Sequence, residues 1–275
     1  MKRIRMIIVG MLACFQLSAQ TYDELISRAM DAVEKDSLAQ AETLFQQALR
    51  LEPANMRNAL LFSNLGTIQR RMGKNKEALE SYSLALNRTP YSITMLLNRA
   101  SLYLEMDHKD KAYVDYCDVI DLDEKNAEAL QFRAYIYMTR RQYQDAKVDY
   151  QRLLEVLPED KTARIGMAMV NQKLHRYHES LEEFNRLIVD YPKDVSLLKA
   201  RAELEMEMNT PELALLDLES AVKLAPHDEE LYVMCGEIYL TLGRKREAYT
   251  AFEKAVEMGV PRSLLHEQLK ASKGR

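Results

Sequence analysis

Residues 127–160 read AEALQFRAYIYMTRRQYQDAKVDYQRLLEVLPED, and the spacing of their small, large and helix-ending residues recurs along the chain. Counted from the first residue of this stretch, alanines stand at positions 8 and 20, Ala134 and Ala146. A tyrosine stands at position 24, Tyr150, and a proline at position 32, Pro158. Apolar side chains recur every three or four residues in two runs, which is the spacing of amphipathic helices. The stretch therefore predicts two consecutive helices, the second of which ends near the proline.

The same pattern returns at a step of 34 residues, apart from three extra residues at 56–58. Position 8 is small in all seven copies: Ala29, Gly66, Ala100, Ala134, Ala168, Ala202 and Gly236. Position 20 is also small: Ala41, Ala78, Ala112, Ala146, Ser180, Ala214 and Ala248. Position 24 is large: Phe45, Tyr82, Tyr116, Tyr150, Phe184, Leu218 and Phe252. Seven units therefore tile residues 22–262.

Each unit has the composition of a helical hairpin. Small residues at positions 8 and 20 let two antiparallel helices approach closely, and the bulky residue at position 24 fills the space beside them. Gly73 and Gly243, at position 15, are typical of the end of a first helix. One such hairpin cannot bury its apolar face alone, so we expect neighbouring hairpins to stack.

On these residues the chain resembles a tetratricopeptide repeat (TPR) protein. The second unit shows the pattern in Leu65-Gly66, Ala78, Tyr82, Ala85 and Pro90. The resemblance implies an all-α fold, an α-solenoid of seven TPR helical hairpins with a C-terminal capping helix. The expected units are 22–55, 59–92, 93–126, 127–160, 161–194, 195–228 and 229–262, followed by a capping helix and tail at 263–275.

Composition and motifs argue against several classes of function. The chain has 275 residues, 38 Lys and Arg, 42 Asp and Glu, and a formal net charge of −4, which is unlike a strongly basic nucleic-acid binder. It has no glycine-rich phosphate loop and no catalytic sequence motif. His175 and His178 fall at the turn between two expected helices, where polar residues are common. We therefore expect a non-catalytic protein with no cofactor, no metal and no nucleic-acid partner.

The first 19 residues differ from the rest of the chain. Lys2, Arg3 and Arg5 precede a short apolar run, which is typical of a secretory signal peptide, and we expect cleavage after Ala19. Later apolar runs are shorter than the roughly 20 residues that span a membrane, so we expect no membrane span in the mature chain. The predicted localisation is export, to the periplasm. A lipid anchor on Cys14 is the alternative.

Comparison of the copies within the chain also suggests charge pairs. Position 7 is arginine and position 23 is aspartate together in three of the seven units. Arg28 with Leu44 in the first unit and Met167 with Glu183 in the fifth are exceptions. If position 8 meets position 20 across an antiparallel hairpin, position 7 should lie near position 23. We therefore expect three structural pairs, Arg99 with Asp115, Arg133 with Asp149 and Arg201 with Asp217. Independent surface charges are the alternative.

The TPR resemblance also implies a concave groove that holds a protein or peptide segment. In TPR proteins, positions 2, 5, 9, 12 and 13 of each unit face that groove. The expected partner-binding residues are Leu97, Ser101, Leu104, Gln131, Tyr135, Met138, Ile165, Met169 and Gln172. The most favoured function is an exported scaffold that binds a partner there. The alternative is an accessory or assembly subunit of a cell-envelope complex.

Overall fold

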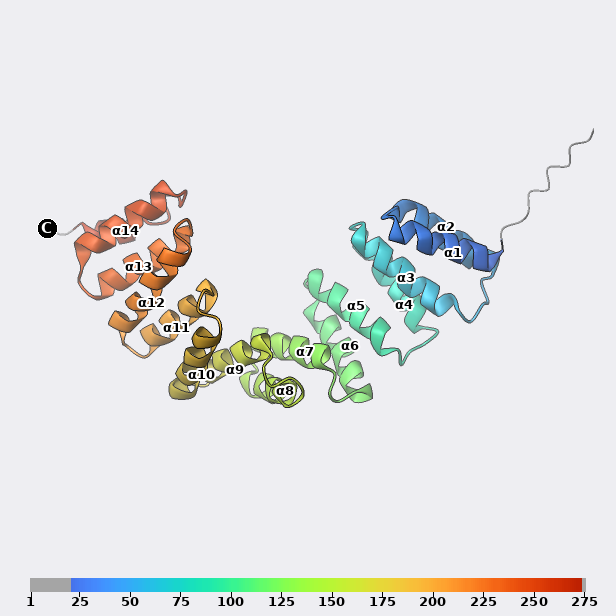
Figure 1. Ribbon diagram of the computed structural model, residues 1–275, viewed down its shortest axis with the longest axis horizontal. Coiled ribbons are helices and arrows are strands. Elements are labelled where there is room, and N and C mark those ends of the chain that lie inside the picture. The colour runs from blue at the N-terminus through green and yellow to red at the C-terminus, as the bar shows by residue number, and fades with distance from the viewer. Residues whose placement is uncertain (1–20, 274–275) are drawn as a thin grey trace, which may run out of the picture. The chain divides into compact units, whose positions relative to one another are not determined.

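The computed structural model describes residues 21–273, and within that range every regular element is a helix. Figure 1 shows the helices in chain order. Their bounds are α1 Tyr22–Glu34, α2 Leu38–Leu51, α3 Asn58–Arg71, α4 Asn75–Leu86, α5 Ile93–Glu105, α6 Lys109–Leu122, α7 Ala127–Thr139, α8 Tyr143–Val156, α9 Lys161–Lys173, α10 Tyr177–Asp190, α11 Val195–Glu207, α12 Pro211–Leu224, α13 Glu229–Thr241, α14 Lys245–Glu257 and α15 His266–Ser272. Helices of odd and even number alternate as first and second helices of hairpins. The all-α fold of hairpins in solenoid packing is thus confirmed.

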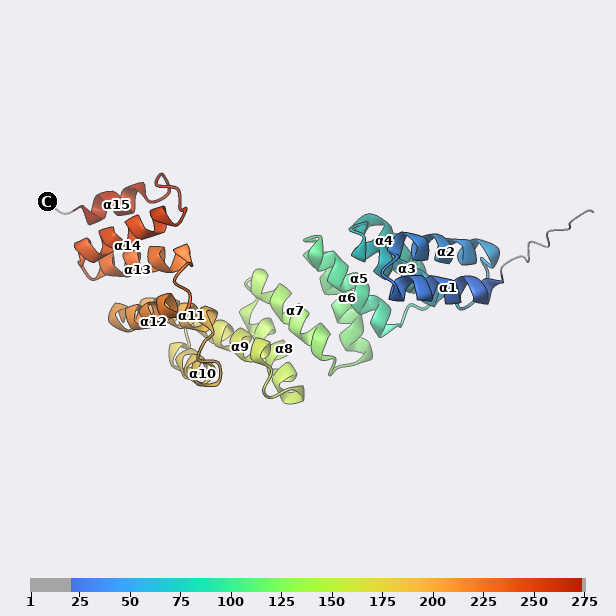
Figure 2. The ribbon, with the colours of Figure 1, turned by 45° about the horizontal axis from the view of Figure 1, so that its top comes forward.

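The chain divides into two compact parts, Met1–Ala112 and Tyr113–Arg275, with the boundary inside α6. These parts are the first and second unit below, and each 34-residue copy of the pattern is a repeat. In the first unit α1 packs against α2 and α3 against α4. In the second unit α7 packs on α8, α9 on α10, α11 on α12 and α13 on α14. The C-terminal helix α15 lies against α14 and α13 (Figure 2). Its own Leu269 and the preceding Leu265 are buried in one cluster with Phe252 of α14. The expected signal peptide lies outside the described residues.

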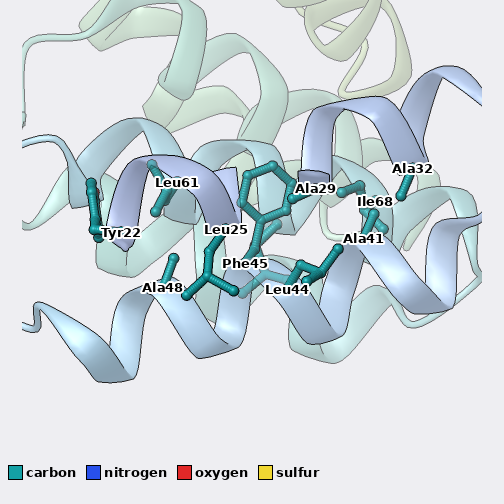
Figure 3. Close-up of a cluster of buried hydrophobic side chains, with 11 residues drawn as sticks. Tyr22, Leu25, Ala29, Ala32, Ala41, Leu44, Phe45, Ala48, Leu61 and Ile68 are labelled. Atoms are coloured by element: carbon teal, nitrogen blue, oxygen red, sulfur yellow. The ribbon is translucent and has the colours of Figure 1, made fainter. Parts of the chain in front are cut away.

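The core of the first unit shows why the pattern needs small residues. Ala29 and Ala41 are fully buried between α1 and α2, and the ring of Phe45 fills the space beside them (Figure 3). Leu61 and Ile68 of α3 complete the same cluster. The first hairpin therefore buries its apolar side only by sharing a core with the next helix, as expected for stacked repeats.

The reversal between the two helices of a hairpin uses one backbone conformation. The residue at position 15 has a positive φ in every repeat, from 55° at Asp36 to 74° at Gly73. Gly73 and Gly243 adopt this left-handed conformation without steric cost, because glycine has no Cβ. The other positions are Asp36, Asp107, Arg141, His175 and Asn209. His175 is thus a turn residue: it follows the C-cap of α9, Leu174, and is exposed.

In the second unit the large residue at position 24 also contacts the following hairpin. The ring of Tyr116 stacks on Phe132 of α7 with the ring centroids 5.6 Å apart. One repeat later, the ring of Tyr150 lies directly on Gly166 of α9, where an added Cβ would overlap three atoms of the ring. Tyr150 is 6% exposed, and its burial raises the pKa of the phenol to about 12. Gly166 therefore sets the distance between α8 and α9.

Gly166→Ala should lower the free energy of unfolding by about 1–2 kcal/mol, because the ring of Tyr150 must move in a packed core. This loss should appear although alanine gains about 1 kcal/mol in helix propensity over glycine. Urea unfolding followed by circular dichroism measures it. Thr162→Ala, an exposed change on the same helix, is the control and should stay within about 0.5 kcal/mol. In a Tyr150→Leu background Gly166→Ala should no longer destabilise; an unchanged loss there would contradict the assignment.

Candidate functional site

The first helices of the second unit present a row of exposed side chains. The residue at position 9 is exposed on each of α7, α9, α11 and α13, as Tyr135, Met169, Glu203 and Glu237. Tyr135 is 47% and Met169 40% exposed, so a large part of each apolar side chain is open to solvent. We call these four residues the position-9 row. The row changes from apolar on α7 and α9 to acidic on α11 and α13.

Polar contacts join successive first helices near this row. Gln172 of α9 donates a hydrogen bond from Nε2 to Oε1 of Glu207 on α11, at 2.9 Å, and Lys173 Nζ lies 3.3 Å from the same oxygen. Lys199 of α11 pairs with Glu230 of α13. Gln172 is only 6% exposed, so its amide joins two helices and presents little surface to a partner.

The remaining residues of the expected groove fall into two groups, one in each unit. In the second unit Gln131, Met138 and Ile165 are partly exposed. In the first unit Leu97, Ser101 and Leu104 are partly exposed on α5. The hydroxyl of Ser101 accepts a hydrogen bond from Arg70 Nη2 at 3.0 Å, beside the ion pair of Arg70 with Glu105. Tyr135 and Met169 are thus the two most exposed apolar members of the expected set.

Two of the expected Arg–Asp pairs lie inside hairpins of the second unit. Arg133 donates two hydrogen bonds to Asp149, at 2.7 and 2.8 Å, and Arg201 donates two to Asp217, at 2.7 and 2.6 Å. The side chains of Arg133 and Asp149 are 14% and 2% exposed. The bidentate contact raises the pKa of the Arg133 guanidinium, because the charged form is the one that binds the carboxylate.

These arginines also reach the second helix of the preceding hairpin. Arg133 Nη1 lies 3.6 Å from Cys117 Sγ on α6, and Arg201 Nη1 donates to Asn185 Oδ1 on α10 at 2.6 Å. Each arginine therefore spans the groove between two neighbouring second helices. The third expected pair joins residues of different units and stays a prediction. Within the first unit Arg99 Nη1 lies 3.4 Å from Ser83 Oγ.

Where position 7 is uncharged in the second unit, the same groove is open. A cavity of about 870 Å³ lies over Met167 between α8 and α10, and one of about 1070 Å³ lies over Cys235 between α12 and α14. The cavity over Cys235 is also lined by Tyr232, Tyr239 and Tyr249. The sequence shows Met167 and Cys235 at position 7 of these two repeats, but a cavity depends on the helices around them, which only the folded chain brings together.

Similarity to known proteins agrees with this architecture. A tetratricopeptide repeat protein from Parabacteroides merdae ATCC 43184, known from a crystal structure, is 38% identical, and the match covers 93% of this chain and 100% of that one, with a TM-score of 0.71. Family profiles described as tetratricopeptide repeat match residues 26–93, 93–126 and 229–258. The chain belongs to the tetratricopeptide repeat family.

More distant relatives of this TPR protein match part of its length. The mitochondrial import receptor subunit TOM34 of Pongo abelii is 29% identical over 114 residues, which are 40% of this chain and 37% of that protein. The chain thus spans little more than a third of the length of that curated relative. The structure of YrrB, a TPR protein, is 17% identical over 70% of this chain and 99% of its own, with a TM-score of 0.55, and shares the fold.

In the part of the chain that the structure describes, no three His, Cys, Asp or Glu side chains are grouped so that they could hold a metal ion. No helix among residues 21–273 is long and apolar enough to cross a membrane. Cys117 and Cys235 are free thiols, and burial raises the pKa of Cys235 to about 12, which keeps it protonated at neutral pH.

Arg133→Met should lower the free energy of unfolding by about 3–5 kcal/mol, because it leaves the buried Asp149 carboxylate without its cation. Arg57→Met is the matched control: its pair with Asp23 is more than half exposed and screened by solvent, so a much smaller loss is expected. Thermal and urea unfolding of both variants measure the difference. Equal losses would mean that burial of the Arg133 pair is unimportant for stability.

Proposed function

We propose that this TPR protein is a non-catalytic scaffold that binds a segment of a partner protein along the position-9 row of its second unit. The observation that carries the proposal is the exposure of Tyr135 and Met169 at equivalent places on successive first helices. Large apolar side chains that are held exposed side by side usually belong to an interaction surface. Tyrosine supplies a rigid apolar body with a polar tip, and methionine adapts to the shape of its contact.

The charge along the row specifies the partner further. Beyond Tyr135 and Met169 the row continues with two carboxylates, Glu203 and Glu237. An extended or helical segment with apolar anchors at one end and basic residues at the other would complement this order. The relative TOM34 is by its name a subunit of an import receptor, which supports a protein as the partner of the matching repeats.

Tyr135→Asp combined with Met169→Asp should abolish capture of the partner, because both apolar anchors are replaced by charge. Capture is measured by pull-down from an envelope extract of the cells that make the protein. Helicity and melting should be unchanged, since both side chains are exposed. Val148→Asp combined with Leu216→Asp makes the same change at exposed sites on second helices and should not affect capture. Loss of capture in this control instead would move the partner to the second helices.

The same pull-down separates the scaffold from its alternative, an accessory or assembly subunit of a cell-envelope complex. A partner that stays bound through high-salt washing favours a stable assembly subunit. A partner released by salt favours reversible binding in which the charges of Glu203 and Glu237 contribute.

We also propose that the protein is exported, supported by the basic and apolar pattern of residues 1–19. N-terminal sequencing of the protein from its own cells should begin at Gln20. A chain that retains Met1 would contradict export by cleavage. A lipid on Cys14 would support the anchored alternative.

A further inference from the structure

The groove between α8 and α10 differs from its neighbours at two positions of its floor helix. In the preceding repeat, positions 7 and 11 are Arg133 and Tyr137 on α7. Arg133 spans that groove, and the hydroxyl of Tyr137 is hydrogen-bonded to Tyr113 of α6 at 3.1 Å. In the groove over α9 the same two positions are Met167 and Asn171. Neither side chain bridges the walls, and a cavity of about 870 Å³ remains, which we call the α9 groove.

The α9 groove carries an excess of negative charge. Its lining includes five carboxylates, Glu159, Glu179, Glu182, Glu183 and Asp190, against two guanidinium groups, which leaves three negative charges in excess. Arg164 is already held by Glu183 at 2.6 Å and Asp190 at 2.8 Å. The other cation, Arg186, lies 3.7–3.8 Å from its carboxylates and is two-thirds exposed. The charges of the groove therefore complement a cationic group.

The floor of the α9 groove has a polar atom that lacks a partner. Asn171 lines the cavity and is 9% exposed, and its Oδ1 makes no hydrogen bond. A buried carbonyl oxygen without a donor is unfavourable, and rotation about χ2 can turn this oxygen toward a donor in the cavity. Leu154, Met167 and Val189 supply apolar surface in the same groove. The groove thus combines apolar walls with hydrogen-bond acceptors and negative charge.

We propose that the α9 groove binds an arginine or lysine side chain from a basic segment of a partner protein. The aliphatic stem packs on Leu154 and Met167, while the charged head donates to the carboxylates and to Asn171. Arg164 already holds Glu183, the position-23 carboxylate of this repeat, so the cation of the partner meets Glu179 and Glu182, which Arg164 does not contact. This site is separate from the position-9 row.

Met167 and Met169 make the two sites distinguishable, because they line different surfaces of one helix. The full chain is labelled with ¹³C at the methionine methyl groups and titrated with the peptide Ac-Ala-Ala-Arg-Ala-Ala-NH2. The Met167 signal, assigned through Met167→Leu, should shift in a saturable way, and the Met169 signal should not. The lysine peptide should bind likewise. A citrulline peptide, which has nearly the same shape without the charge, should bind about tenfold more weakly or not at all.

Two kinds of variant test the groove itself, with binding followed on backbone amide signals of α9 and α10. Met167→Arg introduces the arginine that the two neighbouring repeats have at position 7, and it should abolish binding by filling the groove. Met167→Leu should leave the affinity within about twofold. Glu179→Gln combined with Glu182→Gln changes exposed positions only and should weaken binding several-fold. The Tyr135→Asp and Met169→Asp variant should bind the peptide normally.

Three results would overturn the proposal. They are equal binding of the citrulline peptide, a shift at Met169 without one at Met167, and unchanged binding by Met167→Arg. The absence of any saturable shift with both cationic peptides would do the same. None of these results bears on the position-9 row, because capture of its partner is measured with separate variants.

Discussion

Close contact between the two helices of each hairpin is the constraint on which the rest of the structure depends. A small residue at position 8 faces a small residue at position 20, and the bulky residue at position 24 fills the space beside them, as Ala29, Ala41 and Phe45 show in the first unit. Because the large side chain also reaches the next hairpin, the same residue determines spacing within and between repeats. The contact of Tyr150 with Gly166 shows how tight this spacing is.

The residue at position 7 decides whether a further polar contact joins these helices. With arginine there, as in Arg133 and Arg201, a buried ion pair ties the two helices of a hairpin and the guanidinium bridges to the previous second helix. With Met167 or Cys235 there, the bridge is absent and the groove becomes a cavity. Position 7 thus distinguishes repeats whose groove is spanned by an arginine from repeats whose groove is a cavity.

The second unit therefore offers two surfaces with different chemistry on the same set of helices. The position-9 row has apolar side chains that are followed by carboxylates, and it suits a segment laid across several first helices. The α9 groove is acidic and lined by α9, α10 and the end of α8, and it is the proposed site of a single cationic side chain. A helix such as α9 can serve both because Met167 and Met169 leave it in different directions.

The sequence by itself determined the all-α class, the helical hairpins and the positions of their small and large residues, because these depend on local periodicity and on a pattern repeated seven times. It also predicted the partners of Arg133 and Arg201, since arginine at position 7 coincides with aspartate at position 23 in three of the copies. Only the tertiary structure decided which expected groove residues are exposed. Gln172 is buried by its bond to Glu207, a residue 35 positions away, whereas Met169 is exposed.

Two further features required the folded chain. The left-handed turn conformation occurs at Arg141 and His175 as well as at Gly73, because the packing of the two helices imposes it on whatever residue stands at position 15. The cavities over Met167 and Cys235 arise from side chains that are missing between walls formed by three different helices. The pattern within one repeat specifies which side chains a helix presents, but only the neighbouring helices determine where a cavity remains between them.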